Sequence, residues 1–435
     1  MWLHRHSAPA PVPTAARRIW SGLVDLDGDD LPAEPLLATS GAPFDDARLL
    51  VRELGEPLGF VTLPLTDGRL DPTLFRQSVE RTWAAAPRAR LRTAGASLPV
   101  ASPTGDARAA IVPWVAATRA TPVSVVVCTR DRAAALARCL KALRAVEHDA
   151  LEIVVVDSAP TGDDAAHLVA DLQRRDRRLR YLREDRPGLS RARNRGARET
   201  TAELLAFTDD DVRVDPLWVA ALVRGFQCRP DVGCVTGLVA SASLELPGAQ
   251  YFDARVSWAA SCEQRLFDAA RGPRDSRLHP YGAGAFGTGA TMAFRAAALR
   301  EIGGFDERLG AGSPAGGGED LDAFVRVLLA GYRLSYEPAA LAWHEHRVTQ
   351  ADLGRQMYAY GKGLSAYWFK HLVAPRSRRQ VAARLLAAAA RLALLARRSR
   401  VAADQAAVSR FVPACELGGL LVGPFAYLRG RRTAA

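Results

Sequence analysis

The pattern of hydrophobic and polar positions changes near Pro122 of this 435-residue chain. Beyond that point, β-branched runs such as VSVVVC and LEIVVVD alternate with segments whose apolar positions recur at helical spacing, such as RAAALARCLKALRAV. Continuous apolar strands suit a sheet that is covered on both faces, and strands that alternate with helices favour a mostly parallel sheet. We therefore predict an α/β domain over residues 121–350, with helices on both faces of the sheet and its ligand beyond the carboxyl ends of the strands.

The pattern before this domain predicts two smaller parts. Residues 1–43 are rich in alanine, proline and arginine without periodicity, which predicts a loosely ordered lead-in. Residues 44–120 begin with ARLLVRELGEPLGFVTLPL, two apolar runs around a turn, and continue with DPTLFRQSVERTW, which has an aspartate cap and helical spacing. We predict a small α+β unit there, followed by a Pro/Ala-rich linker from Ala86 to Arg119, and the sequence assigns no role to either.

The pattern after this domain predicts a C-terminal helical segment over residues 351–435. Arginines seven residues apart with leucines beside them indicate a basic amphipathic helix: Arg384, Arg391 and Arg398 with Leu385, Leu392 and Leu395. The apolar stretch that follows is interrupted by Glu416 and Pro424, which suits the bilayer interface better than a membrane span, with Arg429, Arg431 and Arg432 at the headgroups. Packing on the α/β domain is the alternative. We favour peripheral attachment at the inner face of the cell membrane, because it also accounts for the basic charge.

Composition narrows the class of protein and its partners. The net charge is +11, with 49% hydrophobic and 24% charged residues, so we expect a globular protein that favours phosphates, nucleic acid or a lipid surface. The six cysteines contain no CxxC pair and fall largely in apolar segments, which indicates reduced thiols in a cytosolic protein rather than disulfides or a zinc ribbon. The first residues lack the apolar region of a secretory signal.

The stretch LLAFTDDDVRVDP places three aspartates directly after an apolar run that predicts a buried strand. Strand alternation would send Asp209 and Asp211 to one side and Asp210 to the other. Neighbouring carboxylates repel one another unless a cation neutralises them, and their hard oxygen atoms suit Mg²⁺ or Mn²⁺. An ordinary solvated turn is the alternative, since aspartate is common in turns.

Other polar side chains follow the neighbouring strands. Thr129 and Arg130 end the first strand, and Asp157 ends the second, where a carboxylate could cap a turn or accept the imide N–H of a uracil ring. In RPGLSRARNRGA, a glycine turn starts a helix whose free N–H groups, together with Arg191 and Arg193, favour a diphosphate. A basic helix exposed to solvent is the alternative.

Two later segments carry further candidate chemistry. In GGGEDLDAFVRVLLAGYRLSYEP, a triple glycine precedes Glu319 and Asp320, so the loop could move over a ligand and leave a carboxylate facing a bound hydroxyl. Partners of the helix dipole are the alternative for these acids. The segment LAWHEHR places His344 and His346 on one face of an extended chain, where a histidine beside a metal-binding carboxylate can supply a nitrogen ligand.

Seven ordered motifs from Pro122 to Arg347 resemble the family-2 glycosyltransferases of the GT-A fold. They are VSVVVCTRDR, EIVVVDSAPTGD, GLSRARNRGA, LLAFTDDDVRVDPLWV, GTGATMAFRAAALREIGGFDERLG, GGGEDLDAFVRVLLAGYRLSYEP and WHEHR. The resemblance implies a set of roles: donor binding for Thr129, Arg130, Asp157, Arg193, Asp209 and Asp210, metal binding for Asp211 and His344, and the catalytic base for Asp320.

The resemblance also implies the reaction, an inverting displacement from a nucleoside-diphosphate sugar, with a UDP-sugar favoured. The acceptor would be a hydroxyl of a lipid-linked or small molecule, and Mg²⁺ or Mn²⁺ would assist. Two departures from the family stand out: Ser158 follows Asp157 where many members have a second acid, and no Gln-x-x-Arg-Trp follows His344. The second departure argues against a processive polymer synthase.

Other functions fit the sequence less well. A nucleotidyltransferase usually has a glycine-rich, lysine-containing loop after its first strand, and a dehydrogenase has GxGxxG there, whereas CTRDRAAAL has no glycine. A nucleic-acid binder would have to bring a polyanion to an acidic cleft, so we expect no nucleic-acid partner. A non-catalytic sugar-nucleotide binder differs from the enzyme only in turnover.

Overall fold

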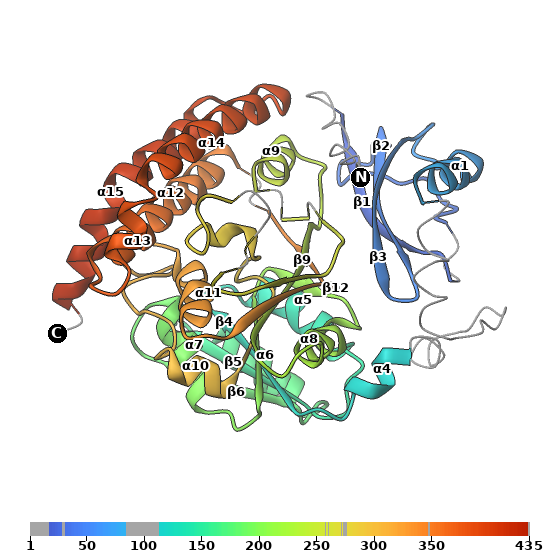
Figure 1. Cartoon of the computed structure of the whole chain (residues 1–435). Coiled ribbons are helices and arrows are strands. Elements are labelled where there is room, and N and C mark those ends of the chain that lie inside the picture. The colour runs from blue at the N-terminus through green and yellow to red at the C-terminus, as the bar shows by residue number, and fades with distance from the viewer. Residues whose placement is uncertain are drawn as a thin grey trace, which may run out of the picture.

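The computed structural model shows an α/β domain with a small sheet on one side and C-terminal helices on the other (Figure 1). The structure describes residues 17–27, 31–83, 113–256, 258–259, 261–270, 272, 276–346 and 349–433. This arrangement agrees with the predicted fold class, an α/β domain with a small N-terminal α+β unit and a C-terminal helical segment.

The central sheet has nine described strands in the order β10-β12-β9-β11-β7-β4-β5-β6, with β8 paired to β12. Their bounds are β4 Val123–Thr129, β5 Leu151–Ser158, β6 Leu179–Glu184, β7 Leu204–Asp209, β8 Val212–Val214, β9 Val232–Ser241, β10 Arg265–Phe267, β11 Met292–Arg295 and β12 Arg333–His344. The pairs β4–β5, β4–β7, β5–β6 and β9–β12 are parallel, while β8, β10 and β11 pair antiparallel with their neighbours. Because β11 is antiparallel to both β7 and β9, six of the nine described strands (β4, β5, β6, β7, β9 and β12) run in one direction, so the sheet is mostly parallel, as predicted.

Alternate residues of each strand enter the cores on opposite faces of the sheet. In β4, Val125 and Val127 lie in one buried cluster with α5, α6 and α8, whereas Val126 lies in the other with α7, α10 and α11. Because both faces are covered, nearly every β4 position is apolar. The helices are α5 Ala133–Arg144, α6 Asp164–Gln173, α7 Leu189–Arg198, α8 Trp218–Gln227, α9 Pro247–Val256, α10 Ala296–Glu301 and α11 Glu319–Leu329.

Strand register brings the polar strand ends together. Thr129 of β4 lies opposite Asp157 of β5, and Cys128 lies opposite Asp209 of β7. On the other half of the sheet, His344 of β12 lies opposite Ser241 of β9. The residues after these strands therefore meet along one edge of the sheet.

The N-terminal unit is a three-stranded sheet with one helix, β1 Ile19–Asp25, β2 Asp46–Glu53, β3 Glu56–Pro64 and α1 Pro72–Trp83. The hairpin turn is Leu54–Gly55, both with positive φ, as the tight turns between twisted strands require. Asp71 caps α1 by accepting from the amides of Thr73 and Leu74.

Our predicted boundary at residue 43 is wrong for part of the lead-in. Residues 1–16 lie outside the described residues, but Ile19–Asp25 pairs in parallel with β2 as an ordered strand. Most of the predicted linker, residues 86–112, also lies outside the described residues, and its end forms the helix α4, Pro113–Thr118, which packs on α8.

Ion pairs fasten the N-terminal unit to the central domain. The buried Arg52 guanidinium of β2 bridges Asp25 at 2.5 Å and Asp215, beyond β8, at 2.9 Å. Glu56 pairs with Arg224 of α8. A buried arginine held between two carboxylates is costly to break, so the unit is an integral part of the folded protein.

The C-terminal segment forms α12 Gln350–Val373, α13 Arg378–Ala382, α14 Leu385–Gln405 and α15 Phe411–Thr433. Glycines let α12 and α15 approach closely, because a Cβ on Gly361 would lie 2.0 Å from the Glu416 carbonyl oxygen. The last helix continues through Pro424, so it is less broken than the sequence suggested. Among the described residues, one helix, Phe411–Gly430, is long and apolar enough to cross a membrane, and 39% of that stretch is buried inside the protein.

Candidate active site

Arg132 forms ion pairs with two aspartates in the acidic turn that follows β7. The Arg132 guanidinium contacts Asp210 Oδ1 at 2.5 Å and Asp211 Oδ2 at 2.9 Å, and the Thr129 hydroxyl donates to Asp210 Oδ2 at 2.7 Å. The strand alternation that we predicted stops at Asp209, because β7 ends there and the next two residues form a turn. Asp210 and Asp211 converge instead.

Arg132 is the site residue that our sequence analysis missed. It lies three positions beyond β4, and 34% of its side chain remains exposed, so it can contact a ligand as well as the acids. The signal in the sequence was a basic residue after a strand that neighbours the acidic strand. That signal becomes readable only when the order of strands in the sheet is known.

Arg193 of α7 is a second, fully buried cation. It contacts Asp209 Oδ1 at 2.9 Å and Glu319 Oε1 at 2.8 Å, and it donates to the Gly289 carbonyl at 3.3 Å. We predicted a donor contact for Arg193, but its guanidinium is engaged by protein acids. At the start of α7, the Leu189 amide donates to the Ala311 carbonyl, so part of the predicted anion site is filled by that loop.

Asp320 and Glu319 occupy different surroundings at the start of α11. Glu319 is buried against Arg193, and burial together with Asp320 raises the pKa of its carboxyl. Asp320 is half-buried and is held by backbone amides, since its Oδ2 accepts from Gly289 N at 2.8 Å and its Oδ1 from Leu321 N at 2.8 Å. The more accessible carboxylate of the pair is therefore Asp320.

The triple glycine before these acids serves close packing. Gly318 begins α11 in a left-handed conformation with φ of 86°, which favours glycine. A Cβ on Gly363 of α12 would lie 2.7 Å from Gly317 Cα, so the two backbones touch. This packing accounts for the glycines in the folded chain, while movement of the loop over a ligand stays a prediction.

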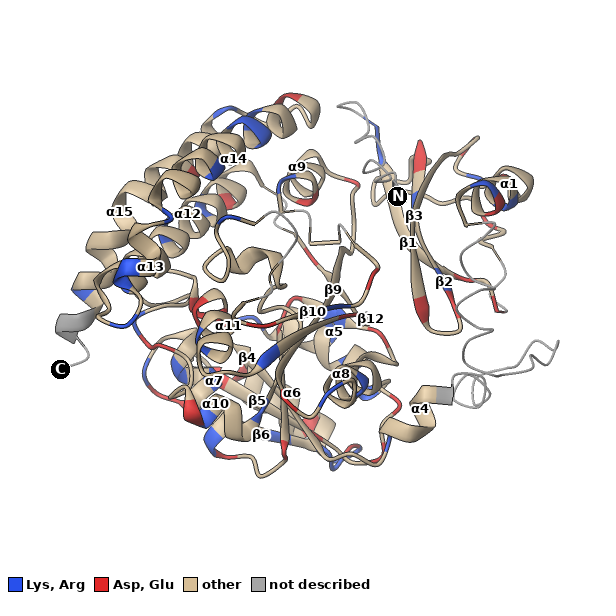
Figure 2. Ribbon diagram, viewed as in Figure 1, with Lys and Arg blue, Asp and Glu red and all other residues tan. Residues whose placement is uncertain are grey.

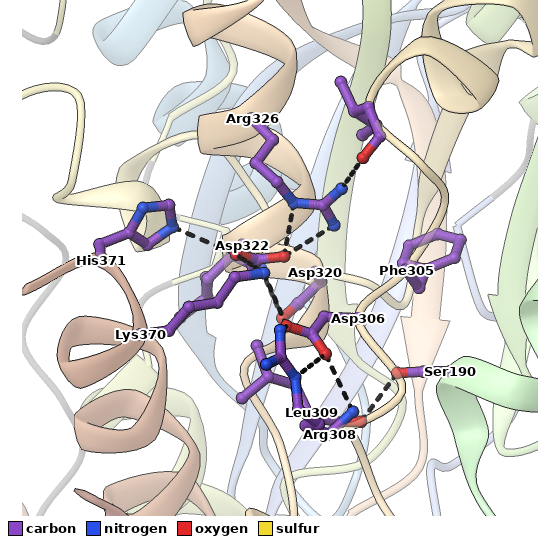
Figure 3. A network of polar contacts seen from close by, with 12 residues as sticks. Ser190, Phe305, Asp306, Arg308, Leu309, Asp320, Asp322, Arg326, Lys370 and His371 are labelled. Carbon is purple, nitrogen blue, oxygen red and sulfur yellow. Dashed lines mark hydrogen bonds and ion pairs between the residues drawn. The ribbon is translucent and has the colours of Figure 1, made fainter. Parts of the chain in front are cut away.

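A buried ionic network fixes α11 against α12 (Figure 3). Asp322 contacts Lys370 Nζ at 2.7 Å, His371 Nε2 at 3.1 Å and the Arg326 guanidinium at 2.7 Å. Although burial disfavours its charge, Arg326 and Lys370 hold the pKa of Asp322 well below its usual range. Lys370 also contacts Asp306 at 2.8 Å. The helix that carries Asp320 is thus anchored two residues beyond it.

Asp157 keeps one oxygen atom free for a ligand. Its Oδ2 accepts from the Tyr181 hydroxyl at 3.0 Å, while its buried Oδ1 has no hydrogen-bond partner among the described residues. Burial raises the pKa of this carboxyl against the effect of Tyr181. A buried acceptor without a partner is costly, so this atom fits the N–H of a bound base. Of the other predicted donor contacts, the Thr129 hydroxyl donates to Asp210, and Arg130 lies at the surface beside Asp131.

His344 lies beside the acidic turn, with its Nε2 3.5 Å from Asp211 Oδ1. In the part of the chain that the structure describes, no group of three or more His, Cys, Asp and Glu residues is positioned to hold a metal ion. Two neighbouring ligands of a small octahedral cation lie roughly 3 Å apart, so one oxygen and one imidazole nitrogen at this separation fit Mg²⁺ or Mn²⁺ as a half-site. A diphosphate and water would complete the ligand set.

The site as a whole carries more acid than base. Five carboxylates (Asp209, Asp210, Asp211, Glu319 and Asp320) surround the two guanidinium groups of Arg132 and Arg193. Burial raises the pKa of Asp210 to about 7 and also raises that of Asp209, although the arginines oppose both shifts. Binding of a cation would relieve this excess of negative charge.

Part of the chain is similar to known glycosyltransferases. Residues 124–303 match the family described as Glycosyl transferase family 2. The chain is 29% identical over 254 residues to the Pre-mycofactocin glycosyltransferase of Mycobacterium tuberculosis, covering 57% of this chain and 48% of that protein. It is 25% identical over 190 residues to the Glucosyl-dolichyl phosphate glucuronosyltransferase of Haloferax volcanii, covering 43% of this chain and 57% of that protein. The chain thus spans about half the length of these curated relatives.

A solved structure with a similar arrangement is the mannosyltransferase PcManGT from Pyrobaculum calidifontis in complex with GDP-Man and Mn²⁺. The TM-score is 0.46 at 20% sequence identity, and the match covers 69% of this chain and 86% of that one.

Proposed function

We propose that this protein, whose residues 124–303 match Glycosyl transferase family 2, transfers a sugar from a nucleoside-diphosphate sugar to an acceptor hydroxyl, with inversion and with a divalent cation. The observation that carries the proposal is the single sheet edge that unites a base-accepting carboxylate, an acidic turn and an accessible carboxylate: Asp157, Asp209 to Asp211, and Asp320.

The donor would lie across the ends of β5, β4 and β7. Asp157 Oδ1 would accept the imide N–H of the base, and Arg132 would face the diphosphate. The Tyr181 hydroxyl donates to Asp157 Oδ2, so Oδ1 is the buried oxygen that has no partner among the described residues. Uracil presents one imide N–H on that edge, whereas guanine presents two adjacent donors. The geometry therefore favours a UDP-sugar.

The transfer step assigns the proton to Asp320. Its carboxylate takes the proton of the acceptor hydroxyl, the hydroxyl oxygen forms a bond to the anomeric carbon, and the bond from that carbon to the diphosphate oxygen breaks. The Gly289 and Leu321 amides hold the carboxylate in place for this task. Asp211 and His344 would hold the cation, which when bound neutralises charge on the leaving diphosphate.

A panel of nucleotide sugars tests the proposal. We expect a UDP-sugar with Mn²⁺ to raise the melting temperature, because binding to the folded state stabilises by about 2.7 kcal/mol at a concentration 100 times Kd. GDP-sugars should give a smaller shift. Asp157→Asn should reduce the UDP-dependent shift, since an amide offers the base a weaker acceptor than a carboxylate.

Release of UDP in the presence of an acceptor would establish turnover. Stabilisation by UDP-sugars without any UDP release, across lipid-linked and small-molecule acceptors, would leave a binding protein and contradict the enzyme. An undiminished UDP-dependent shift in the Asp157→Asn variant would contradict the role of Asp157.

We also propose that the C-terminal helices attach the protein to the cytoplasmic face of a membrane, near a lipid-linked acceptor. Apolar side chains project from the outer face of α15, with Leu421 76% and Phe425 73% exposed. On α14, Leu386 is exposed among arginines, and basic residues colour this helix in Figure 2. Exposed apolar groups beside cationic groups fit an anionic lipid surface.

The faces of α14 and α15 that are turned away from solvent contact each other and the rest of the protein. Leu392 and Leu395, which we had placed beside the basic face, line a cavity of about 380 Å³ between α14 and α15. Glu416 is buried with Arg255 and Ser399, so α15 presents a paired charge to the protein interior. These contacts favour a helix that lies in the interface over one that spans the bilayer.

Sedimentation with liposomes tests the attachment. The double change Leu421→Gln and Phe425→Gln should weaken binding to anionic liposomes at least tenfold, because burying such a side chain is worth about 1.5–3 kcal/mol. Leu37→Gln is the matched control, since Leu37 is 57% exposed on the N-terminal unit and should not affect binding. Failure of the wild-type protein to sediment at low salt would defeat the membrane proposal.

A further inference from the structure

A chain of hydrogen bonds runs from the N-terminal unit to His344. The Arg48 guanidinium of β2 pairs with Asp253 Oδ2 of α9. At the end of β9, the Ser241 hydroxyl donates to Asp253 Oδ1 at 2.6 Å and lies 2.7 Å from His346 Nε2. His346 Nδ1 in turn lies 3.1 Å from His344 Nδ1. The chain is continuous, and it ends at the histidine that faces Asp211.

Aromatic side chains enclose the two histidines. The Phe252 ring lies 4.5 Å from the His346 ring and is stacked 6.2 Å from the His344 ring, and the Trp258 ring meets His344 edge-on at 5.7 Å. These aromatic rings pack around both imidazoles. Each ring nitrogen has a defined partner.

The donor and acceptor of each hydrogen bond in the chain can be assigned by starting from the Asp253 carboxylate. Asp253 only accepts, so the Ser241 hydroxyl donates to it, and the Ser241 oxygen accepts from His346 Nε2–H. A neutral imidazole that donates from Nε2 accepts at Nδ1, so His346 takes the Nδ1–H of His344. His344 Nε2 then presents its lone pair to Asp211 Oδ1, 3.5 Å away. A divalent cation between these two atoms would bind both the imidazole nitrogen and the carboxylate oxygen.

We propose that the N-terminal unit fixes the tautomer and ring orientation of His344 through the chain Arg48, Asp253, Ser241 and His346. The inference rests on the proposed function, because the prepared Nε2 is a ligand for its divalent cation. Arg48, Asp253, Ser241 and His346 are positioning residues, since they act through His344. Partners of this kind typically change metal affinity by about 10–100-fold.

The anchoring of β2 supports this role. Arg48 is held over the Phe60 ring at 4.6 Å, and on the same strand the buried Arg52 bridges to Asp215 of the central domain. The Ser21 hydroxyl of β1 donates to the Ser241 carbonyl at 2.8 Å, so the unit also touches the backbone at the middle of the chain. The N-terminal unit, to which the motifs assign nothing, thus reaches the active site.

Ser241→Ala tests the inference, because it removes one hydroxyl and keeps the backbone contact to Ser21. We expect the affinity for Mn²⁺ in the presence of UDP, measured by electron paramagnetic resonance, to fall about 10–100-fold. The affinity for UDP without metal and the melting temperature should stay close to those of the wild type. Arg48→Gln should weaken Mn²⁺ binding in the same direction.

Glu56→Gln is the matched control for Arg48→Gln. It also removes an ion pair between the two units, with Arg224, but it lies outside the chain of hydrogen bonds. Its Mn²⁺ affinity should equal that of the wild type. Equal losses in both variants would overturn the inference, because they would indicate loosened packing rather than loss of the chain.

A second measurement needs no metal. In protein with ¹⁵N-labelled histidine, long-range ¹H–¹⁵N correlations should assign the Nδ1–H tautomer to His344, identified with His344→Gln, and Ser241→Ala should mix the two tautomers. An Nε2–H tautomer in the wild type, or unchanged Mn²⁺ affinity in Ser241→Ala, would overturn the inference. If the wild type binds no Mn²⁺ with UDP, the proposed function fails, and the tautomer still decides this inference.

Discussion

Replacing Asp320 by asparagine should reduce the rate of sugar transfer by about 10²–10⁴-fold, the range for loss of a general base. The amide of asparagine can no longer take the proton of the acceptor hydroxyl. Asp320 makes no contact with the donor-facing Asp157 or Arg132, so donor affinity should stay within a few-fold. Steady-state kinetics and donor titration of the same protein measure both quantities.

Glu319→Gln, at the adjacent position, is the comparison variant for the stability of Asp320→Asn. Glu319 is buried against Arg193, so its loss leaves part of a buried charge unpaired and should lower the free energy of unfolding by roughly 3–5 kcal/mol. Asp320→Asn should unfold close to the wild-type temperature, since its carboxylate is paired only with amides. A collapse of donor affinity in Asp320→Asn would place Asp320 in the donor site and contradict its role as base.

The sequence predicted the central domain because its strands are continuously apolar and β-branched. Both faces of β4 and β5 are buried, and this burial is what makes VSVVVC and LEIVVVD readable as strands. The strand β1 was missed for the opposite reason. In IWSGLVD only Ile19, Val24 and Asp25 are buried, and its pairing with β2 comes after a long connection. Local pattern carries little information about such a strand.

The sequence predicted which acidic residues form the candidate site. It did not predict which arginines contact them. The acids can be recognised in the sequence because they follow predicted strands. Which arginine contacts each acid depends on the order of the strands in the sheet. Arg132 reaches Asp210 because β4 lies beside β7, and Arg193 reaches Glu319 across 126 residues of sequence. Long-range pairings of this kind have no spacing rule, so they emerged only from the folded chain.

The chain of hydrogen bonds from Arg48 to His344 could not be predicted from the sequence for the same reason. WHEHR suggested that His344 and His346 share a face, and they do lie together. Nothing in the pattern indicated that a serine at the end of β9 and an arginine of the N-terminal unit would complete the connection. The role of a small unit without motifs became visible through its contacts.

Replacing Asp211 by asparagine should remove the dependence of turnover on divalent cations and lower the rate by at least about 10²-fold. Asparagine keeps the size of the side chain but halves its hard oxygen atoms and removes the charge, so the half-site with His344 binds a cation poorly. Asp211 lies in the turn beyond β7, outside the apolar cores, so the fold should persist.

Asp210→Asn separates loss of the cation from loss of Arg132. Both aspartates contact Arg132, but Asp210 turns its other oxygen to Thr129, whereas Asp211 turns its other oxygen to His344. If the cation is held as proposed, Mn²⁺ affinity should fall much further in Asp211→Asn than in Asp210→Asn. Equal affinities in the two variants, or undiminished turnover of the wild type in excess chelator, would contradict the metal assignment and leave Arg132 as the cation that stabilises the leaving diphosphate.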